Sequence, residues 1–240
     1  MHSWKPDAYG EAPGIVGALL AGGVTTVAFT ALLRVRAVVG ASGAGALADR
    51  TLLGLGLFSL GMAALFLLGT QDFKRMLAYA SVEHMGILSV GTALGAAGLS
   101  AALFHVWGNA LTKGALFLSA GNLRRAAGSS LLGQVRGMGR LLPVSSSLWV
   151  AGLFAATALP PFASFFSELQ VVRASLAMGK GWSAAVLLGC LLLCFLGMSR
   201  VVLGVVEGRP PLAVRRQAVR FTESAGLVVP PVVLLVASLW

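Results

Sequence analysis

The clearest shortage in this sequence is of charge. Charged residues make up 11% of the 240 residues, and only eight residues are acidic, whereas 57% are hydrophobic. Soluble domains carry about 25% charged residues, so this composition excludes a water-soluble globule of the same size. The mean hydropathy of +0.87 is that of a chain whose solvent is lipid.

Cysteine is scarce too, and so are the motifs of cofactor-binding proteins. The two cysteines, Cys190 and Cys194, lie one helical turn apart in an apolar run with no other metal-binding side chain beside them. A structural zinc site needs four ligands, so we interpret both as small apolar packing residues. The sequence has no Walker loop, no GxSxG elbow and no histidine pair spaced for haem. It therefore predicts no cofactor, no metal site and no redox centre in this chain.

Basic residues, by contrast, outnumber acidic ones, giving a net charge of +10 and a pI near 11.1. A basic protein can bind nucleic acid through phosphate contacts. Here most of the basic residues are spread over short connections between apolar runs and are not gathered in a polar domain. This distribution is typical of membrane topology signals and speaks against a nucleic-acid partner.

Apolar runs divide the chain into membrane-length segments after a polar start of fourteen residues that lacks the pattern of a signal peptide. The fifth run is too long for one straight span and contains Pro160 and Pro161, which predict a broken or re-entrant helix. We therefore predict an all-α, polytopic transmembrane helix bundle with about seven spans, forming a single transmembrane domain over 1–240. The predicted runs are 15–35, 52–69, 76–94, 99–123, 144–178, 182–206 and 225–240.

The basic residues between these runs fall mainly on one side of the predicted bundle. Eleven lie on one side, namely Lys5, Lys74, Arg75, Arg124, Arg125, Arg136, Arg140, Arg209, Arg215, Arg216 and Arg220. Four lie on the other side, namely Arg34, Arg36, Arg50 and Lys180. By the positive-inside rule, we predict a multi-pass protein of the cell inner (plasma) membrane with a cytoplasmic N-terminus and an external C-terminus at Trp240.

A few ionisable residues lie inside the predicted spans, where a charge costs at least about 2.5–3.5 kcal/mol at the bilayer centre. His105, Asn109 and Lys113 are spaced by four, so they share one helix face over about 12 Å. Burial favours the neutral form of a lysine, so Lys113 is a candidate for proton exchange. Alternatively, Lys113 is satisfied by a nearby carbonyl or carboxylate and serves packing alone.

Other intramembrane charges also have two interpretations. Glu168 follows the predicted proline break, where membrane transport sites are often built; alternatively, it pairs with Arg173. Glu83 and His84 lie close to the charged segment Asp72–Arg75, so they face a water-filled vestibule, as either a proton relay or a stabilising network. Arg200 is interpreted as a packing residue at the end of its run.

Four local patterns resemble segments of one family, the antiporter-like subunits of complex I and membrane-bound hydrogenases. These are His2–Ala8 with Glu11–Pro13, Asp72–Ser81, His105–Gly121, and the segment from Leu159-Pro160 to Glu168. They occur in the family's order. Lys5–Gly14 and Val82–Gly86 are most similar to the F subunit of hydrogenase 4.

The resemblance implies a role for each matching residue. It makes Lys113 the central membrane lysine and Glu168 the residue that exchanges protons with the far side, while His105 matches the first histidine of its motif. Asn109 replaces the family's second histidine and can bridge water without carrying a proton. The first span, where relatives place a His or Lys, offers only Leu20 and Thr26, so Glu83 and His84 are an alternative route.

The resemblance covers the second half of a fourteen-helix subunit, which favours a truncated gene model or a split gene. It implies an ion-translocating membrane subunit (proton, or sodium) of a hydrogenase or NADH:quinone oxidoreductase-type complex, with other membrane subunits as partners and the redox chemistry in those partners. The alternative is a non-conducting structural half-subunit that docks neighbouring membrane subunits. A stand-alone antiporter is the third possibility.

Overall fold

The computed structural model describes residues 4–212, 214 and 223–239, and every regular element among them is a helix. The α-helices are α1 (Lys5–Glu11), α2 (Gly14–Leu19), α3 (Thr25–Val39), α4 (Gly45–Gly69), α5 (Phe73–Thr92), α6 (Gly95–Ala127), α7 (Met138–Leu141), α8 (Pro143–Ala156), α9 (Ala163–Ala177), α10 (Gly181–Val206) and α12 (Ala225–Ala237). Two short π-helices, η1 (Leu20–Val24) and η2 (Gly40–Ala44), join α2 to α3 and α3 to α4. The predicted all-α class is confirmed.

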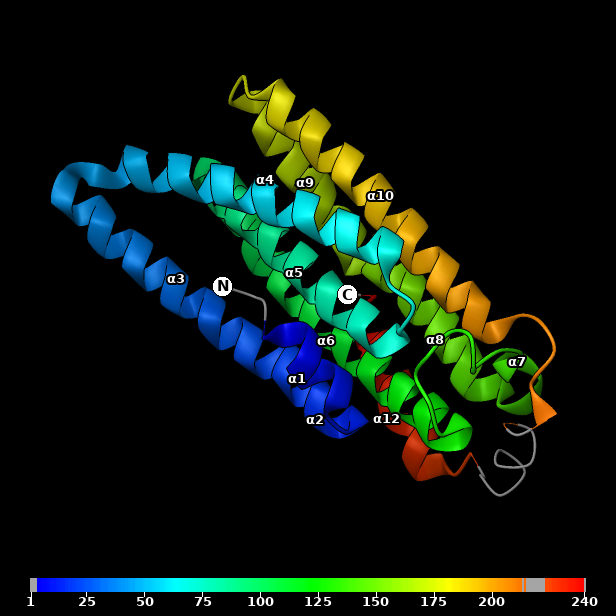
Figure 1. Ribbon diagram of the computed structural model, residues 1–240. Helices are drawn as coiled ribbons and strands as arrows, with labels where there is room; N and C mark the ends of the chain where they lie inside the picture. Colours follow the sequence, from blue (N-terminus) through cyan, green and yellow to red (C-terminus); the bar gives the residue numbers. More distant parts are fainter. Residues whose placement is uncertain (1–3, 213, 215–222, 240) are drawn as a thin grey trace.

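The predicted apolar runs lie mainly in helices where the structure describes them, and the number of membrane crossings stays a prediction. Two helical stretches are long and apolar enough to cross a membrane by themselves, Gly14–Gly69 and Gly181–Val206. The helices α8 and α12 are apolar but shorter. The first of the two long stretches is not one straight rod, because the chain reverses within η2 and α3 and α4 form the two arms of a hairpin (Figure 1).

The hairpin corrects the long connection implied between the first two predicted runs, 15–35 and 52–69. Helix α3 continues to Val39 and α4 resumes at Gly45, so only five residues connect the arms. Gly43 has φ +85, which is backbone that glycine adopts without a Cβ penalty. Arg36 pairs with Asp49 at 2.7 Å across the two arms. The basic residues of this segment therefore extend the helices rather than populate a loop.

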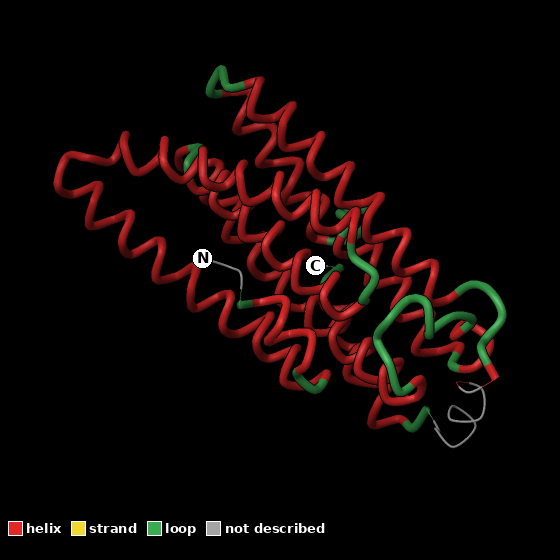
Figure 2. Tube along the Cα trace, viewed as in Figure 1, coloured by secondary structure: helices red, strands yellow, loops and turns green. Residues whose placement is uncertain are grey.

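Helix α6 is the centre of the bundle (Figure 2). It packs against α2, α5, α8, α9 and α12. With 33 residues it is about 50 Å long, more than the hydrocarbon core of a bilayer. Other helices surround its middle. By contrast, α4 and α10 expose rows of large apolar residues at the surface.

The fifth predicted run is interrupted where the prolines lie. Helix α8 ends at Ala156 and α9 begins at Ala163, so the six residues between them are not helical. The first amide of α9, at Ala163, donates to the carbonyl of Ser238 at the end of α12. The start of α9 is thus held in the bundle by a segment far away in the sequence.

The segments rich in basic residues meet at one end of the molecule. The Lys74 ammonium binds the carbonyls of Gly10 (2.7 Å) and Ala12, and Arg200 binds the carbonyl of Thr70 at 2.9 Å. The connection after α6 reaches the same place, since the Gly137 amide donates to the carbonyl of Glu207. Of the residues counted on this side, Arg215, Arg216 and Arg220 lie outside the described residues, as does Trp240.

Candidate functional site

The predicted ladder on α6 lies in the interior of the bundle. His105 and Lys113 are fully buried and Asn109 is 4% exposed. Within the described part of the chain, Lys113 Nζ and Asn109 Oδ1 have no hydrogen-bond partner. The packing alternative for Lys113, in which a carbonyl or carboxylate satisfies its ammonium, therefore finds no such group among these residues.

Glu83 and His84 face this ladder from α5. Both are at most 2% exposed. Lys113 lies within electrostatic reach of Glu83, of His84 and of His105. Adjacent residues on one helix rarely face the same group, yet α5 and α6 pack closely enough for both side chains to lie beside Lys113. From α10, the thiol of Cys194 approaches the Glu83 carboxylate.

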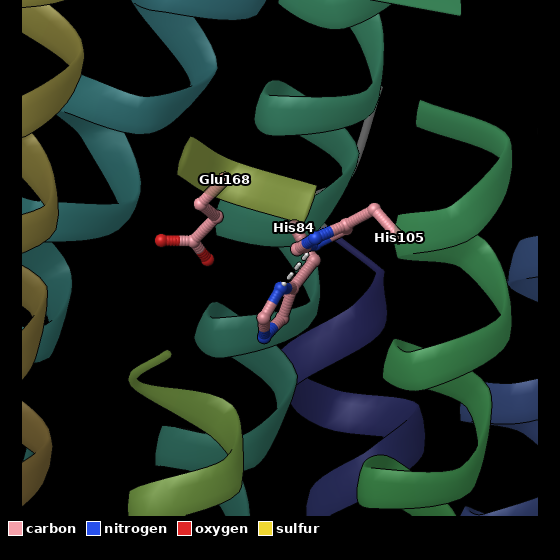
Figure 3. A group of neighbouring side chains, drawn as sticks. All are labelled: His84, His105 and Glu168. Atoms are coloured by element: carbon pink, nitrogen blue, oxygen red, sulfur yellow. Dashed lines mark hydrogen bonds between the residues drawn. The ribbon is translucent and has the colours of Figure 1, made fainter. Parts of the chain in front are cut away.

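The two histidines are in direct contact, which joins α5 to α6 (Figure 3). His84 Nδ1 lies 2.9 Å from His105 Nε2. His105 Nδ1 lies 2.8 Å from Ser167 Oγ on α9, and that hydroxyl donates to the carbonyl of Ser164 at 2.8 Å. Four polar groups on three helices thus form one hydrogen-bonded chain.

The direction of this chain follows from the donor count. Ser167 has one hydroxyl proton, which it donates to Ser164, so His105 Nδ1–H must be the donor to Ser167 Oγ. In neutral rings, His105 Nε2 is then the acceptor and His84 Nδ1–H the donor. His84 Nε2 is left with a free lone pair, and it has no partner among the described residues. A proton added there could move through both rings.

Glu168 lies next to this pair and comes from the second turn of α9. Its carboxylate and one nitrogen of each histidine lie within 4.8 Å of one another (Figure 3). Such a group could hold a metal ion by distance alone. However, both nitrogens of His105 are already engaged, one with His84 and one with Ser167. The arrangement suits proton transfer better than metal binding.

Helix α9 reaches His105 because α6 carries a glycine at the crossing. A Cβ at Gly108 would lie 3.1 Å from the Cβ of Ala163, so a larger residue would separate the two helices. Gly108 is three residues after His105, about one turn along α6. The close crossing therefore brings Ser164, Ser167 and Glu168 to the level of His105.

A cavity of about 740 Å³ opens at the end where the basic segments meet. Its lining is largely polar and includes Glu11, Asp72, Arg75, Tyr79, Arg124 and Ser130. Tyr79 and Glu83 are four residues apart on α5, so Glu83 lies about 6 Å deeper than Tyr79 on the same helix face. Neither Glu83 nor His84 lines this cavity, so a water-filled vestibule beside them stays a prediction.

The two arginines of the predicted spans, Arg173 and Arg200, lie elsewhere. Arg173 is exposed, and no ion pair within the described part of the chain includes Glu168. Arg200 binds a backbone carbonyl at the end of α10, which agrees with a packing role. In the first span, Thr26 donates to the carbonyl of Gly22 on its own helix, whereas Thr25 is 3% exposed and faces the interior. The π-helical turn η1 just before Thr25 changes which side chains face inward.

Sequence reasoning missed three residues of this region. Ser167 was not singled out in the segment after the proline break, although its place beside Glu168 was a usable signal. Cys194 looked like apolar filler because its neighbour Glu83 is on another helix. Lys5, which we assigned to a basic connection, is only 4% exposed. Its assignment is corrected, since α1 folds against α5 and covers it.

Comparison with known proteins places the chain in a family. Residues 1–195 match the family of NADH:quinone oxidoreductase/Mrp antiporter transmembrane proteins. The hydrogenase-4 component F homolog of Methylacidiphilum infernorum is 33% identical over 190 residues, which are 79% of this chain and 40% of that protein. NADH-quinone oxidoreductase subunit N of Desulforudis audaxviator is 33% identical over 206 residues, which are 84% of this chain and 41% of that protein.

A solved structure shows the same fold. The Mrp complex from Dietzia sp. contains a chain that superposes with a TM-score of 0.85 at 24% identity, covering 99% of this chain and 52% of that one. The chain spans about 40% of the length of the hydrogenase-4 component F homolog and of NADH-quinone oxidoreductase subunit N. By the match over most of its residues, this chain belongs to the NADH:quinone oxidoreductase/Mrp antiporter transmembrane family.

Proposed function

We propose that this chain is the proton-translocating (or sodium-handling) part of a membrane subunit in a hydrogenase or NADH:quinone oxidoreductase-type complex. Other membrane subunits of such a complex are its partners, and the electron chemistry takes place in them. Residues 1–240 act as one transmembrane domain, equivalent to the second half of an antiporter-like subunit. The names of the relatives support the type of complex.

One observation carries the proposal, namely a continuous series of buried ionisable groups across α5, α6 and α9. It begins at Glu83, below the polar cavity, and continues through Lys113, His84 and His105 to Glu168. Buried charges in a membrane protein are costly and mark ion or proton pathways. Nothing in a purely structural bundle requires so many of them at its centre.

Water completes the path. Six buried polar side chains around the ladder have an atom without a hydrogen-bond partner among the described residues, namely Thr25, Glu83, His84, Asn109, Thr112 and Lys113. Buried polar groups in native proteins are satisfied by protein or by ordered water. Hydration along this face would let protons pass between groups that do not touch, including across Asn109.

The proton steps follow from the donor directions. A proton leaving Lys113 Nζ reaches the free lone pair of His84 Nε2 through water. His84 then releases its Nδ1 proton to His105 Nε2, and His105 releases its Nδ1 proton to Glu168 through water, while Ser167 holds the ring in place. Each ring gains one proton and loses one, and it returns to its first tautomer by ring rotation or by back-transfer. Glu168 then delivers the proton towards the far side.

The test is proton uptake by the assembled complex in vesicles, with electron transfer measured separately to control for assembly. Lys113→Ala and Glu168→Gln should each reduce uptake about 100-fold, the lower end of what a positioned proton-transfer group contributes. Lys113→Arg should also fail, because a guanidinium keeps its proton at any working pH. Asn109→Ala should do less, since a water can replace the amide.

A second candidate function is a structural one, in which the chain only docks neighbouring subunits. The exposed apolar rows on α4 and α10, which include Phe58, Leu65, Leu192 and Leu196, favour it. The same experiment separates the two functions. Wild-type uptake in both Lys113→Ala and Glu168→Gln would refute the relay and leave the docking function.

A further inference from the structure

Lys5 is a further buried lysine besides Lys113 and Lys74, and it lies outside the series described above. It is in the first turn of α1 and is 4% exposed. Burying an ammonium group is costly unless the charge is paired, hydrated or released. The described residues form no ion pair with Lys5. Its contacts therefore do not explain why a lysine occupies this position.

The contacts of α1 fix its position along α6. Tyr9 is fully buried and its ring meets that of Phe117 edge-on, with centroids 5.5 Å apart. Further along both helices, Glu11 pairs with Arg124 at 3.4 Å. The two helices therefore run in the same direction. Lys5 precedes Tyr9 by one turn, just as Lys113 precedes Phe117 by one turn.

This alignment brings the two lysines to the same level of the bundle, within electrostatic reach of each other. Helix α2 also packs closely against α6 at this level, since a Cβ at Gly17 would lie 2.5 Å from the Phe117 ring. Besides Lys5, the titratable groups within electrostatic reach of Lys113 are Glu83 and His84 on α5, His105 on α6 and Cys194 on α10.

Two ammonium groups so close in a low-dielectric interior repel each other, so they do not both hold a proton without cost. A proton arriving at Lys5 therefore favours release of the proton on Lys113. The first span has no ionisable side chain facing the ladder, only Thr25, which lies beside Tyr9. Lys5 is in place to supply the group that this span lacks.

We propose that Lys5 is a proton-carrying residue that hands protons to Lys113 from the end of the molecule where the basic segments meet. The step rests on the proposed function. A proton leaves Lys5 Nζ through water and adds to the lone pair of a neutral Lys113 amine. Lys5 becomes the neutral amine and takes the next proton, while Lys113 passes its own on to His84. The α1–α2 junction at that end, held by Lys74 and Arg124, is where the proton enters.

The test compares four variants of the complete complex in vesicles. Lys5→Met keeps the length of the side chain and removes the proton site, so proton uptake should fall about tenfold or more. Lys5→Arg keeps a positive charge that does not release its proton, so proton uptake should fall by a similar factor. Lys5→His restores a group that gains and loses protons near neutral pH, so it should recover part of the uptake. Lys180→Met, at the α9–α10 turn, is the matched control and should pump at the wild-type rate.

Each outcome decides the proposal. Recovery in Lys5→His but not in Lys5→Arg supports a proton carrier. Full uptake in Lys5→Arg would show that Lys5 acts as a fixed charge, and wild-type uptake in Lys5→Met would show that it does not act at all; either result overturns the proposal. Electron transfer and the amount of assembled complex identify a variant that fails to fold. If Lys5→Met fails to fold, the comparison of proton uptake in Lys5→His and Lys5→Arg decides the proposal. Loss of uptake in Lys113→Ala with normal uptake in Lys5→Met would refute only the role of Lys5.

Discussion

At the scale of single residues, the chemistry depends on which atoms of His105 are occupied. Its Nδ1 proton is directed to Ser167, and this leaves Nε2 as an acceptor for His84. The tautomer of a histidine is set by the hydrogen bond that its other nitrogen makes. In the proposed relay, Ser167 is therefore a positioning residue, which orients the His105 ring without carrying the proton itself.

Ser167→Ala should slow proton uptake without abolishing it. The change removes one hydrogen bond, worth about 1 kcal/mol, which corresponds to a fall of about fivefold if transfer through His105 limits the rate. Ser147→Ala is the control, because Ser147 is exposed and bonds only to the carbonyl of Pro143 on its own helix. Proton uptake in vesicles measures both. A loss of 100-fold in Ser167→Ala, equal to that of Lys113→Ala, would mean that Ser167 carries the proton.

How far the site could be predicted from sequence also differs by residue. The spacing of His105, Asn109 and Lys113 predicts their common face, because it depends only on the helical period. The contact of His84 with His105 was not predictable, since it depends on how α5 and α6 are rotated about their axes. Lys5 was misassigned because a lysine in the polar first fourteen residues looks like a solvated one until the fold that buries it is known.

At the scale of elements, the interrupted segment between α8 and α9 determines where Glu168 lies. The prolines at 160 and 161 made an interruption predictable from sequence. The position of α9 was not predictable, because two distant contacts set it. One is the amide of Ala163 on the carbonyl of Ser238, and the other is the close crossing at Gly108.

Gly108→Leu should therefore impair both stability and proton uptake. The new side chain would begin 3.1 Å from the Cβ of Ala163 and push α9 away from α6. Overpacking of this kind costs about 1–3 kcal/mol, and it also lengthens the path between His105 and Ser167. The melting temperature of the purified complex and proton uptake in vesicles measure the two effects.

The matched control for this change is Gly54→Leu on α4. No heavy atom lies within 4 Å of a Cβ at Gly54, which is exposed at the surface of the bundle. Both changes replace glycine by a strong helix former, so a difference between them reports the crossing and not the helix. Equal stability and equal uptake in the two variants would contradict the role of the close crossing.

At the scale of the whole molecule, charge is distributed unevenly between the two ends. Contacts of Lys74 with Gly10, of Arg124 with Glu11 and of Arg200 with Thr70 gather one set of connections at a single end. The hairpin at Gly43 and the turn at Lys180 belong to the other set. The alternation of basic segments along the sequence was predictable, because successive long helices reverse direction. The contacts that hold the connections together at the basic end were not predictable, since they join segments far apart in the chain.

The asymmetry predicts the orientation of the chain in the membrane. By the positive-inside rule, the end that contains the connection after α6 faces the cytoplasm. We expect Gln134→Cys, in that connection, to resist an impermeant thiol reagent in intact cells and to react after permeabilisation. Lys180→Cys, at the opposite end, should react in intact cells. Both are made with Cys190→Ala and Cys194→Ala to remove the native thiols. Labelling of position 134 from outside would reverse the orientation, and protons would then enter at Lys5 from the external side instead of the cytoplasm.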